Sequence, residues 1–137
     1  MSDASKEILT QLNIKYRQVD NIPMSDELFT YNSNINAHFA AIWKNCFTKL
    51  HIFELEEFTK IIFLDADIMI LKNLDHLFKK PHLMAALDGE YFNIWPDWPH
   101  FNSGCLVIEP SIQEFNNILN YINNFDINIA HEGVIAD

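Results

Sequence analysis

Lys60-Ile-Ile-Phe-Leu-Asp-Ala-Asp-Ile-Met-Ile-Leu-Lys72 is the stretch that decides the fold of this chain. Four consecutive apolar residues, Ile61 to Leu64, predict a strand that is buried on both faces. Two carboxylates, Asp65 and Asp67, follow where that strand ends. In open α/β sheets, ligands bind beyond the carboxyl ends of the strands. We therefore expect an α/β fold with this acidic pair at its ligand-binding edge.

The two carboxylates lie so close in sequence that they repel each other unless a cation or a proton lies between them. A hard divalent ion, Mg²⁺ or Mn²⁺ holding a substrate phosphate, suits oxygen ligands of this kind. A calcium loop of the EF-hand type is excluded, because Ile68, Met69 and Ile70 occupy positions that need oxygen ligands and a glycine. Two other interpretations remain: a solvated turn or helix cap, and a phosphatase-like site with one Asp as nucleophile and the other as acid.

Length and composition restrict the class of protein. The 137 residues suffice for one domain, and 49% of them are hydrophobic, which is typical of a globular chain. A net charge of −10 without a basic cluster argues against nucleic acid or an anionic membrane surface as partner. No apolar run is long enough for a transmembrane segment. Cys46 and Cys105 stand in apolar surroundings, which predicts buried free thiols and a reducing, cytoplasmic location.

Further elements follow from apolar periodicity and from Pro, Gly and Ser positions. Helices are expected over residues 3–12 and 39–50 and after the capping pattern Ser111-Ile-Gln-Glu114. Additional strands are expected at residues 16–20, 84–87 and 105–108. Trp95 and Trp98 lie in an irregular stretch and suit either stacking on sugar rings or packing within a lid. Because an α/β chain normally begins with a strand, the opening helix predicts an N-terminal unit outside this sequence.

Several stretches resemble a known family in their order and spacing. They are Phe47-Thr-Lys-Leu-His51, Lys60 to Leu71, Asp75-His-Leu-Phe78, Phe101-Asn-Ser-Gly104 and Glu109-Pro-Ser111. Together they are similar to the glycogenin-like family 8 of the glycosyltransferases. The resemblance implies a GT-A fold, a Rossmann-like α/β sandwich with a mixed, mostly parallel sheet. It also implies Mn²⁺-dependent transfer of a sugar from a UDP-sugar to a glycan or protein acceptor, with retention at the anomeric carbon.

The same resemblance implies roles for individual residues. Asp65 and Asp67 would hold Mn²⁺, or Mg²⁺ in its place, and with Ala66 they would bind the ribose and diphosphate of the donor. Lys49, in the Thr-Lys-Leu stretch, would lie beside the donor sugar and phosphate. Lys49 would share catalysis with Asp137, which matches the Asp that opens the family's Asp-Gln motif.

Asn102, Ser103 and Gly104 match the stretch that lines the donor-sugar pocket of the family. Two parts of the family pattern are absent: the first strand with the residues that hold uracil, and a His-x-x-Gly-x-x-Lys-Pro-Trp region whose His completes the metal site. We therefore expect residues 1–137 to form a single, incomplete catalytic domain with a tendency to self-associate. The competing interpretations are a phosphatase and a non-catalytic sugar- or protein-binding remnant.

Overall fold

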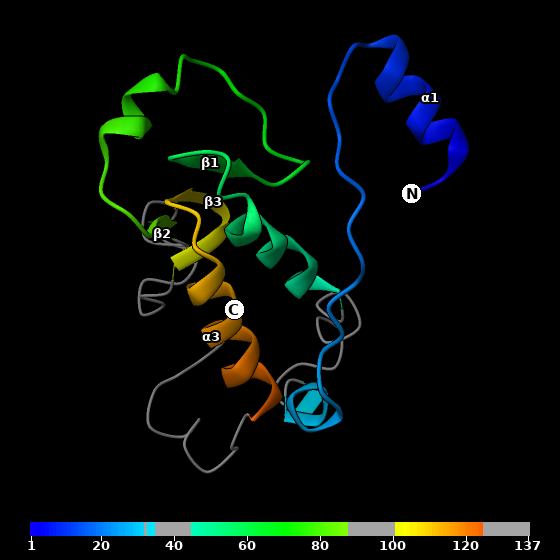
Figure 1. The fold of residues 1–137 in the computed structure, drawn as a ribbon, viewed down its shortest axis with the longest axis vertical. Helices are drawn as coiled ribbons and strands as arrows, with labels where there is room; N and C mark the ends of the chain where they lie inside the picture. Colours follow the sequence, from blue (N-terminus) through cyan, green and yellow to red (C-terminus); the bar gives the residue numbers. More distant parts are fainter. Residues whose placement is uncertain (32, 35–44, 88–100, 125–137) are drawn as a thin grey trace.

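The structure is a computed structural model that describes residues 1–31, 33–34, 45–87 and 101–124. Its helices and strands include α1 (Asp3–Gln11), the 3₁₀ helix η1 (Cys46–Glu54), β1 (Ile61–Leu64), the 3₁₀ helix η2 (Asp75–Lys79), β2 (Met84–Leu87), β3 (Phe101–Ile108) and α3 (Ile112–Asn123). Residues 26–31 are helical as well. Figure 1 shows the strands close together, with η1 and α3 side by side below them and α1 standing apart.

The three strands form one sheet in the order β1-β3-β2, and both pairings are antiparallel. The expectation of a mostly parallel sheet is therefore wrong for the strands that the structure describes. A short apolar run indicates burial but carries no information on strand direction, which depends on how the chain connects the strands. Antiparallel pairing has a consequence for the site, because Leu64 at the end of β1 lies opposite Cys105, near the middle of β3.

The core lies between the sheet and the pair formed by η1 and α3. Leu106 and Ile108 are two residues apart on β3, so they face the same side of the sheet, where they meet Phe53 of η1 and Phe115 of α3. β3 is the middle strand and the most buried of the three. This confirms the prediction of a second buried strand at residues 105–108. β1 forms as predicted but is half-buried along its whole length, because it pairs on one side only within the described sheet.

Helix α3 confirms the helix expected after the capping pattern. The Ser111 hydroxyl accepts a hydrogen bond from the backbone N–H of Glu114 at 3.3 Å, which satisfies one of the free donors at the helix start. The Glu114 carboxylate does not complete the reciprocal half of a capping box; its Oε2 lies 3.0 Å from Nε2 of His82. Phe115 and Ile122 are buried and bring this helix onto the core.

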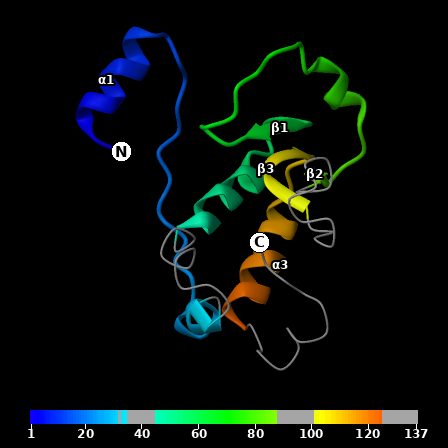
Figure 2. The same cartoon turned by 180° about the vertical axis from the view of Figure 1, so that it is seen from behind.

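Two predicted elements differ in the structure. Residues 39–44 of the expected helix over 39–50 lie outside the described residues, and the remainder belongs to a 3₁₀ helix that continues to Glu54. Residues 16–20 form no strand. Side-chain contacts hold this segment instead, because His51 Nε2 lies 2.9 Å from the backbone O of Asp20 and Arg17 pairs with Glu57. Figure 2 shows the segment descending from α1 past η1.

None of the helices in the described part of the chain combines the length and the apolar character needed to cross a bilayer. The stretch with Trp95 and Trp98, for which stacking or lid packing was predicted, lies outside the described residues.

Candidate functional site

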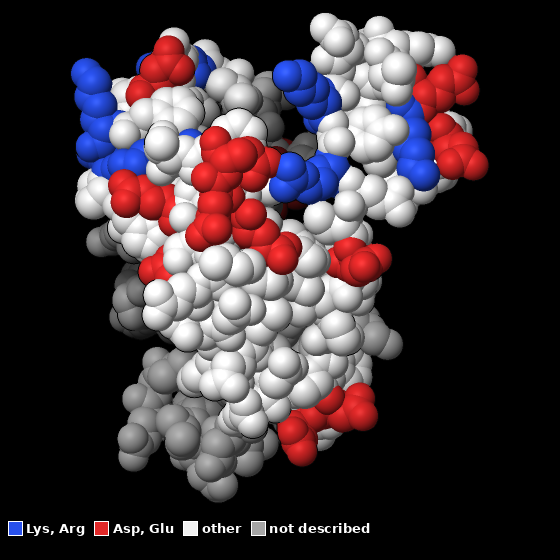
Figure 3. Space-filling model, viewed as in Figure 1, with Lys and Arg blue, Asp and Glu red and all other residues white. Residues whose placement is uncertain are grey.

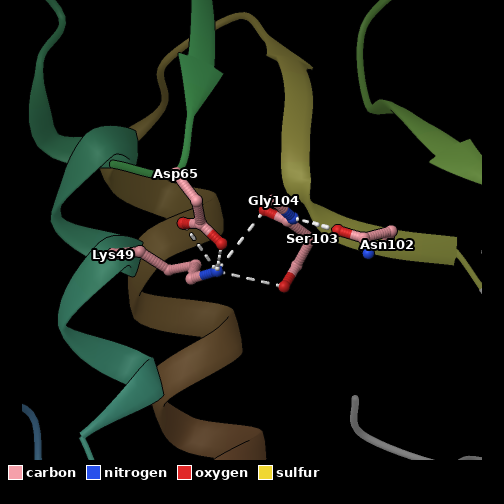
Figure 4. Close-up of polar contacts among 5 residues, drawn as sticks. All are labelled: Lys49, Asp65, Asn102, Ser103 and Gly104. Carbon is pink, nitrogen blue, oxygen red and sulfur yellow. Dashed lines mark hydrogen bonds and ion pairs between the residues drawn. The ribbon is translucent and has the colours of Figure 1, made fainter. Parts of the chain in front are cut away.

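An ion pair between Lys49 of η1 and Asp65, the residue after β1, forms the centre of the candidate site (Figure 4). Lys49 Nζ lies 3.2 Å from both carboxylate oxygens of Asp65. The same ammonium lies 3.1 Å from the hydroxyl and 3.5 Å from the backbone O of Ser103. An ammonium has three protons to donate, so these acceptors satisfy it fully. The pair is partly accessible, with 22% of the Lys49 side chain and 37% of the Asp65 side chain exposed.

Gly104 allows the two strand ends to approach closely. Its backbone N–H donates to Oδ1 of Asn102 at 2.7 Å, and its carbonyl accepts from the backbone N–H of Asp65 at 2.8 Å. A Cβ at this position would lie 2.7 Å from Asn102 Oδ1, closer than packed atoms tolerate, and 3.1 Å from Asp65 Oδ2, which is a tight contact. A glycine is therefore required here if Asn102 and Asp65 are to keep their positions.

Five of the predicted site residues are brought together by this arrangement, namely Lys49, Asp65, Asn102, Ser103 and Gly104. Ala66 and Asp67 follow Asp65 and are exposed. Asp67 forms no hydrogen bond or ion pair with the residues that the structure describes, so its carboxylate faces solvent. Asp137 lies outside the described residues. The roles of all these residues remain predictions.

Phe63 is a contributor that the sequence reasoning missed. The centre of its ring lies 5.4 Å from Lys49 Nζ, within the range of a cation–π contact. Phe63 and Asp65 are two positions apart on an extended chain, so they point to the same side of the sheet. The alternation of side chains along a strand was the signal available in the sequence. A side chain that reaches Asp65 from this side of the sheet also lies near Phe63.

A cavity of about 610 Å³ adjoins the ion pair, within the size range of small-molecule sites. Its walls come from η1, β3, α3 and the helical residues 26–31, and they are largely apolar, including Leu28, Phe53 and Ile122. Lys49 and Asp65 contribute polar groups to the same walls. The arrangement therefore offers a charged cluster beside an apolar hollow.

Cys46 also lines this cavity. Burial raises the pKa of its thiol, and the nearby Lys49 cation lowers that pKa in part. Both Cys46 and Cys105 are free thiols, as predicted, but each is half-buried rather than fully buried. The raised pKa disfavours the thiolate at neutral pH, so Cys46 is not an activated nucleophile.

The candidate metal ligands are the carboxylates of Asp65 and Asp67. Within the described ranges, no cluster of three or more His, Cys, Asp or Glu side chains forms a closed metal site. Mg²⁺ and Mn²⁺ are commonly held by one or two carboxylates, with substrate phosphates and water supplying the other oxygens. The donor set therefore fits a metal bound together with a diphosphate, and it does not fit an all-protein cage.

The surface charge makes local cations important for any anionic ligand. On the face in Figure 3, acidic side chains gather across the middle, and basic side chains lie to either side in the upper half. The chain as a whole carries a net charge of −10. A diphosphate approaching such a surface is repelled unless a cation at the site compensates for the charge. Lys49, beside Asp65, is a cation at the candidate site.

Comparison with known proteins extends over most of the chain. Residues 1–132 match the model of the family described as glycosyl transferase family 8. A 73-residue stretch, 53% of the chain, is 44% identical to glycogenin-1 of Mus musculus and covers 20% of that protein. A 77-residue stretch, 56% of the chain, is 38% identical to putative UDP-glucuronate:xylan alpha-glucuronosyltransferase 3 of Arabidopsis thaliana and covers 11% of it. The matched stretches thus span a fifth or less of these curated relatives.

Proposed function

The chain belongs to glycosyl transferase family 8, which confirms the resemblance in its sequence, and on that premise we propose that it serves in retaining transfer of a sugar from a UDP-sugar to a glycan or protein acceptor. The observation that carries the proposal is the grouping of Lys49, Asp65 and Ser103 at the wall of the cavity, next to the exposed carboxylate of Asp67. This arrangement combines a cation for phosphate, oxygen ligands for a metal and space for a sugar.

Asp65 and Asp67 would hold Mn²⁺ together with the diphosphate of the donor. The metal supplies Lewis-acid stabilisation of the negative charge that develops on the departing UDP. Lys49 adds a second positive charge near the same oxygens, and this charge is worth more in a partly enclosed cavity than in water. Gly104 keeps Asp65 in place by accepting the hydrogen bond from its backbone N–H at 2.8 Å.

Asn102 is suited to bind the donor sugar. Its Oδ1 accepts the hydrogen bond from the backbone N–H of Gly104, and this bond fixes the orientation of the amide. The amide nitrogen points away from Gly104 in Figure 4 and has no hydrogen-bond partner among the described residues. It therefore offers two N–H donors to sugar hydroxyl groups.

The donor and acceptor classes are inferred from the names of the related proteins. The Arabidopsis relative is named for UDP-glucuronate and xylan, and other matched proteins are glycogenins. We take a UDP-sugar as the shared donor class and a glycan or protein as the acceptor class. The phosphatase alternative is weaker, because the family whose model matches residues 1–132 is one of glycosyl transferases.

The test measures UDP released from UDP-glucose and UDP-glucuronate in the presence of Mn²⁺. We expect Mn²⁺-dependent release that falls about 100-fold in Asp67→Asn, because the variant loses a charged ligand at the reacting diphosphate. Glu27→Gln is the matched control, since Glu27 is exposed, lies on another element and forms no hydrogen bond or ion pair with the described residues. Release that is unaffected by Asp67→Asn, or phosphate release from sugar phosphates in its place, would contradict the proposal.

A further inference from the structure

Lys49 already pairs with the carboxylate of Asp65, the candidate metal ligand. Its Nζ is 3.2 Å from Oδ1 and 3.2 Å from Oδ2, so both oxygens of the candidate metal ligand face one ammonium. Ser103 holds the ammonium from the other side through its hydroxyl at 3.1 Å. A second cation that approached these oxygens would meet a positive charge at short range.

We propose that Lys49 is an internal placeholder for the metal ion. In the metal-free protein, its ammonium neutralises Asp65. When Mn²⁺ and the diphosphate bind together, the ammonium leaves Asp65 and turns to the diphosphate oxygens. The inference rests on the proposed function, and it adds that Lys49 couples metal binding to nucleotide binding.

The physical need for a placeholder follows from burial and charge. Asp65 is 37% exposed and borders a largely apolar cavity, so leaving its carboxylate unpaired there costs part of its hydration. Lys49 removes that cost while no ligand is bound. The Lys49 ammonium repels a doubly charged metal ion at Asp65. At a separation of about 5 Å in a water-like medium, this repulsion weakens binding of the metal alone about tenfold. The diphosphate relieves the repulsion by accepting Lys49, so metal and nucleotide strengthen each other's binding.

The surroundings of Lys49 allow its ammonium to turn without moving the backbone. The lysine reaches the site from η1 through a flexible four-carbon stem, and 22% of its side chain is exposed. The ring of Phe63 beside it offers a contact that does not fix one rotamer. Asp65, in contrast, is held through its backbone N–H by Gly104. The ammonium is thus the mobile partner and the carboxylate the fixed one.

The first test titrates Mn²⁺ alone, without nucleotide, and follows free Mn²⁺ by electron paramagnetic resonance. Lys49→Met should bind the metal about tenfold more tightly than the unaltered protein, because the repelling charge is gone. Lys72→Met changes the net charge equally at an exposed lysine with no hydrogen bond or ion pair to the described residues, and it should bind as the unaltered protein does. With UDP present, the advantage of Lys49→Met should disappear. Equal affinity of the two variants for Mn²⁺ alone would overturn the proposal.

A second measurement on the unaltered protein avoids any folding defect in Lys49→Met. Acetylation of lysine side chains, read by mass spectrometry, should be slow at Lys49 without ligands, faster with saturating Mn²⁺ alone, and slow again with Mn²⁺ and UDP. Lys72 should react at one rate throughout. A Lys49 rate that does not respond to Mn²⁺ alone would overturn the placeholder role.

The two proposals fail in distinguishable ways. If Asp67→Asn leaves Mn²⁺-dependent UDP binding intact, the metal site is wrong and the placeholder proposal falls with it. If Asp67→Asn abolishes that binding while neither test detects Lys49 at Asp65, the proposed function stands and the placeholder role alone is refuted.

Discussion

Gly104 is the residue whose chemistry most directly determines the geometry of the site. Its missing side chain lets the amide of Asn102 and the carboxylate of Asp65 lie on either side of one backbone position. The Asn102 amide oxygen accepts a hydrogen bond from the Gly104 N–H, and the Gly104 carbonyl accepts one from the backbone N–H of Asp65, which fixes the position of that residue. The sugar-binding and metal-binding groups of the proposed function are therefore aligned by one residue.

Gly104→Ala should destabilise the protein by about 1–3 kcal/mol, because its Cβ would overlap Asn102 Oδ1. Urea unfolding measures this change. The same substitution made in an Asn102→Ala background should cost less, since the atom it meets at 2.7 Å is no longer there. Strictly additive costs in the double variant would show that the close contact does not determine the effect.

The thiol of Cys46 reports on the charge of Lys49. Burial raises the pKa of this thiol and Lys49 opposes the rise, so Lys49→Met should raise the pKa further. Because the thiolate is the reactive form, alkylation of Cys46 by iodoacetamide near pH 8 should become slower in that variant. The rate is measured in a Cys105→Ser background, which leaves one thiol in the chain. Lys72→Met serves as the control, and an equal slowing there would remove Lys49 as the cause.

At the scale of elements, the sequence predicted the features that interactions between neighbouring residues determine. The strands at residues 61–64, 84–87 and 105–108 and the helix after Ser111 all occur, because apolar runs and a capping residue act over a few neighbouring positions. The predicted sheet was mixed and mostly parallel, whereas the described strands pair antiparallel; strand direction depends on connections between distant segments. The strand expected at residues 16–20 does not form, also because pairing depends on distant segments. Its residues have a suitable composition, but no strand among the described residues lies beside them.

The candidate site was likewise predictable only in part: its residues could be identified from the sequence, but the contacts between distant stretches could not. Asp65 and its neighbours were identified from one stretch, and the family resemblance supplied Lys49 and Asn102. That these groups meet was not predictable from the expected sheet. In a parallel pairing, the end of β1 would lie toward the end of β3 near Ile108, whereas the antiparallel register places Leu64 opposite Cys105. The contact of Asp65 with Gly104, and the contacts that Lys49 makes with both Asp65 and Ser103, thus depend on the strand pairing, which the sequence left undetermined.

The start of α3 offers a direct test of an element-scale prediction. Ser111→Ala removes the hydroxyl that accepts from the Glu114 N–H at 3.3 Å, and it should lower the free energy of unfolding by about 1 kcal/mol. Ser111→Asp retains an acceptor at the same position and should stay close to the unaltered protein. Chemical denaturation measures both variants. If the alanine and aspartate variants are equally stable, the cap does not contribute as described.

For the whole molecule, the stretch after the acidic pair is unusual in its exposure. Met69 is 80% exposed and Leu71 is 83% exposed, and Ile68 and Ile70 beside them are exposed as well. A contiguous apolar surface of this kind favours association. We predict concentration-dependent self-association in sedimentation velocity, reduced in Met69→Lys. Lys72→Met, which adds no charge to this stretch, should not reduce it. A protein that stays monomeric at all concentrations would contradict the prediction.

The central claim is that the acidic pair, with Lys49, forms a metal-dependent site for the diphosphate of a UDP-sugar. Isothermal titration of UDP in the presence and absence of Mn²⁺ tests it most directly. The protein should bind UDP with Mn²⁺ and far more weakly without it, because a chain with a net charge of −10 repels an uncompensated diphosphate. Asp67→Asn should lose the Mn²⁺ dependence, and Glu27→Gln should keep it. Equal UDP affinity with and without Mn²⁺ in the unaltered protein would contradict the account.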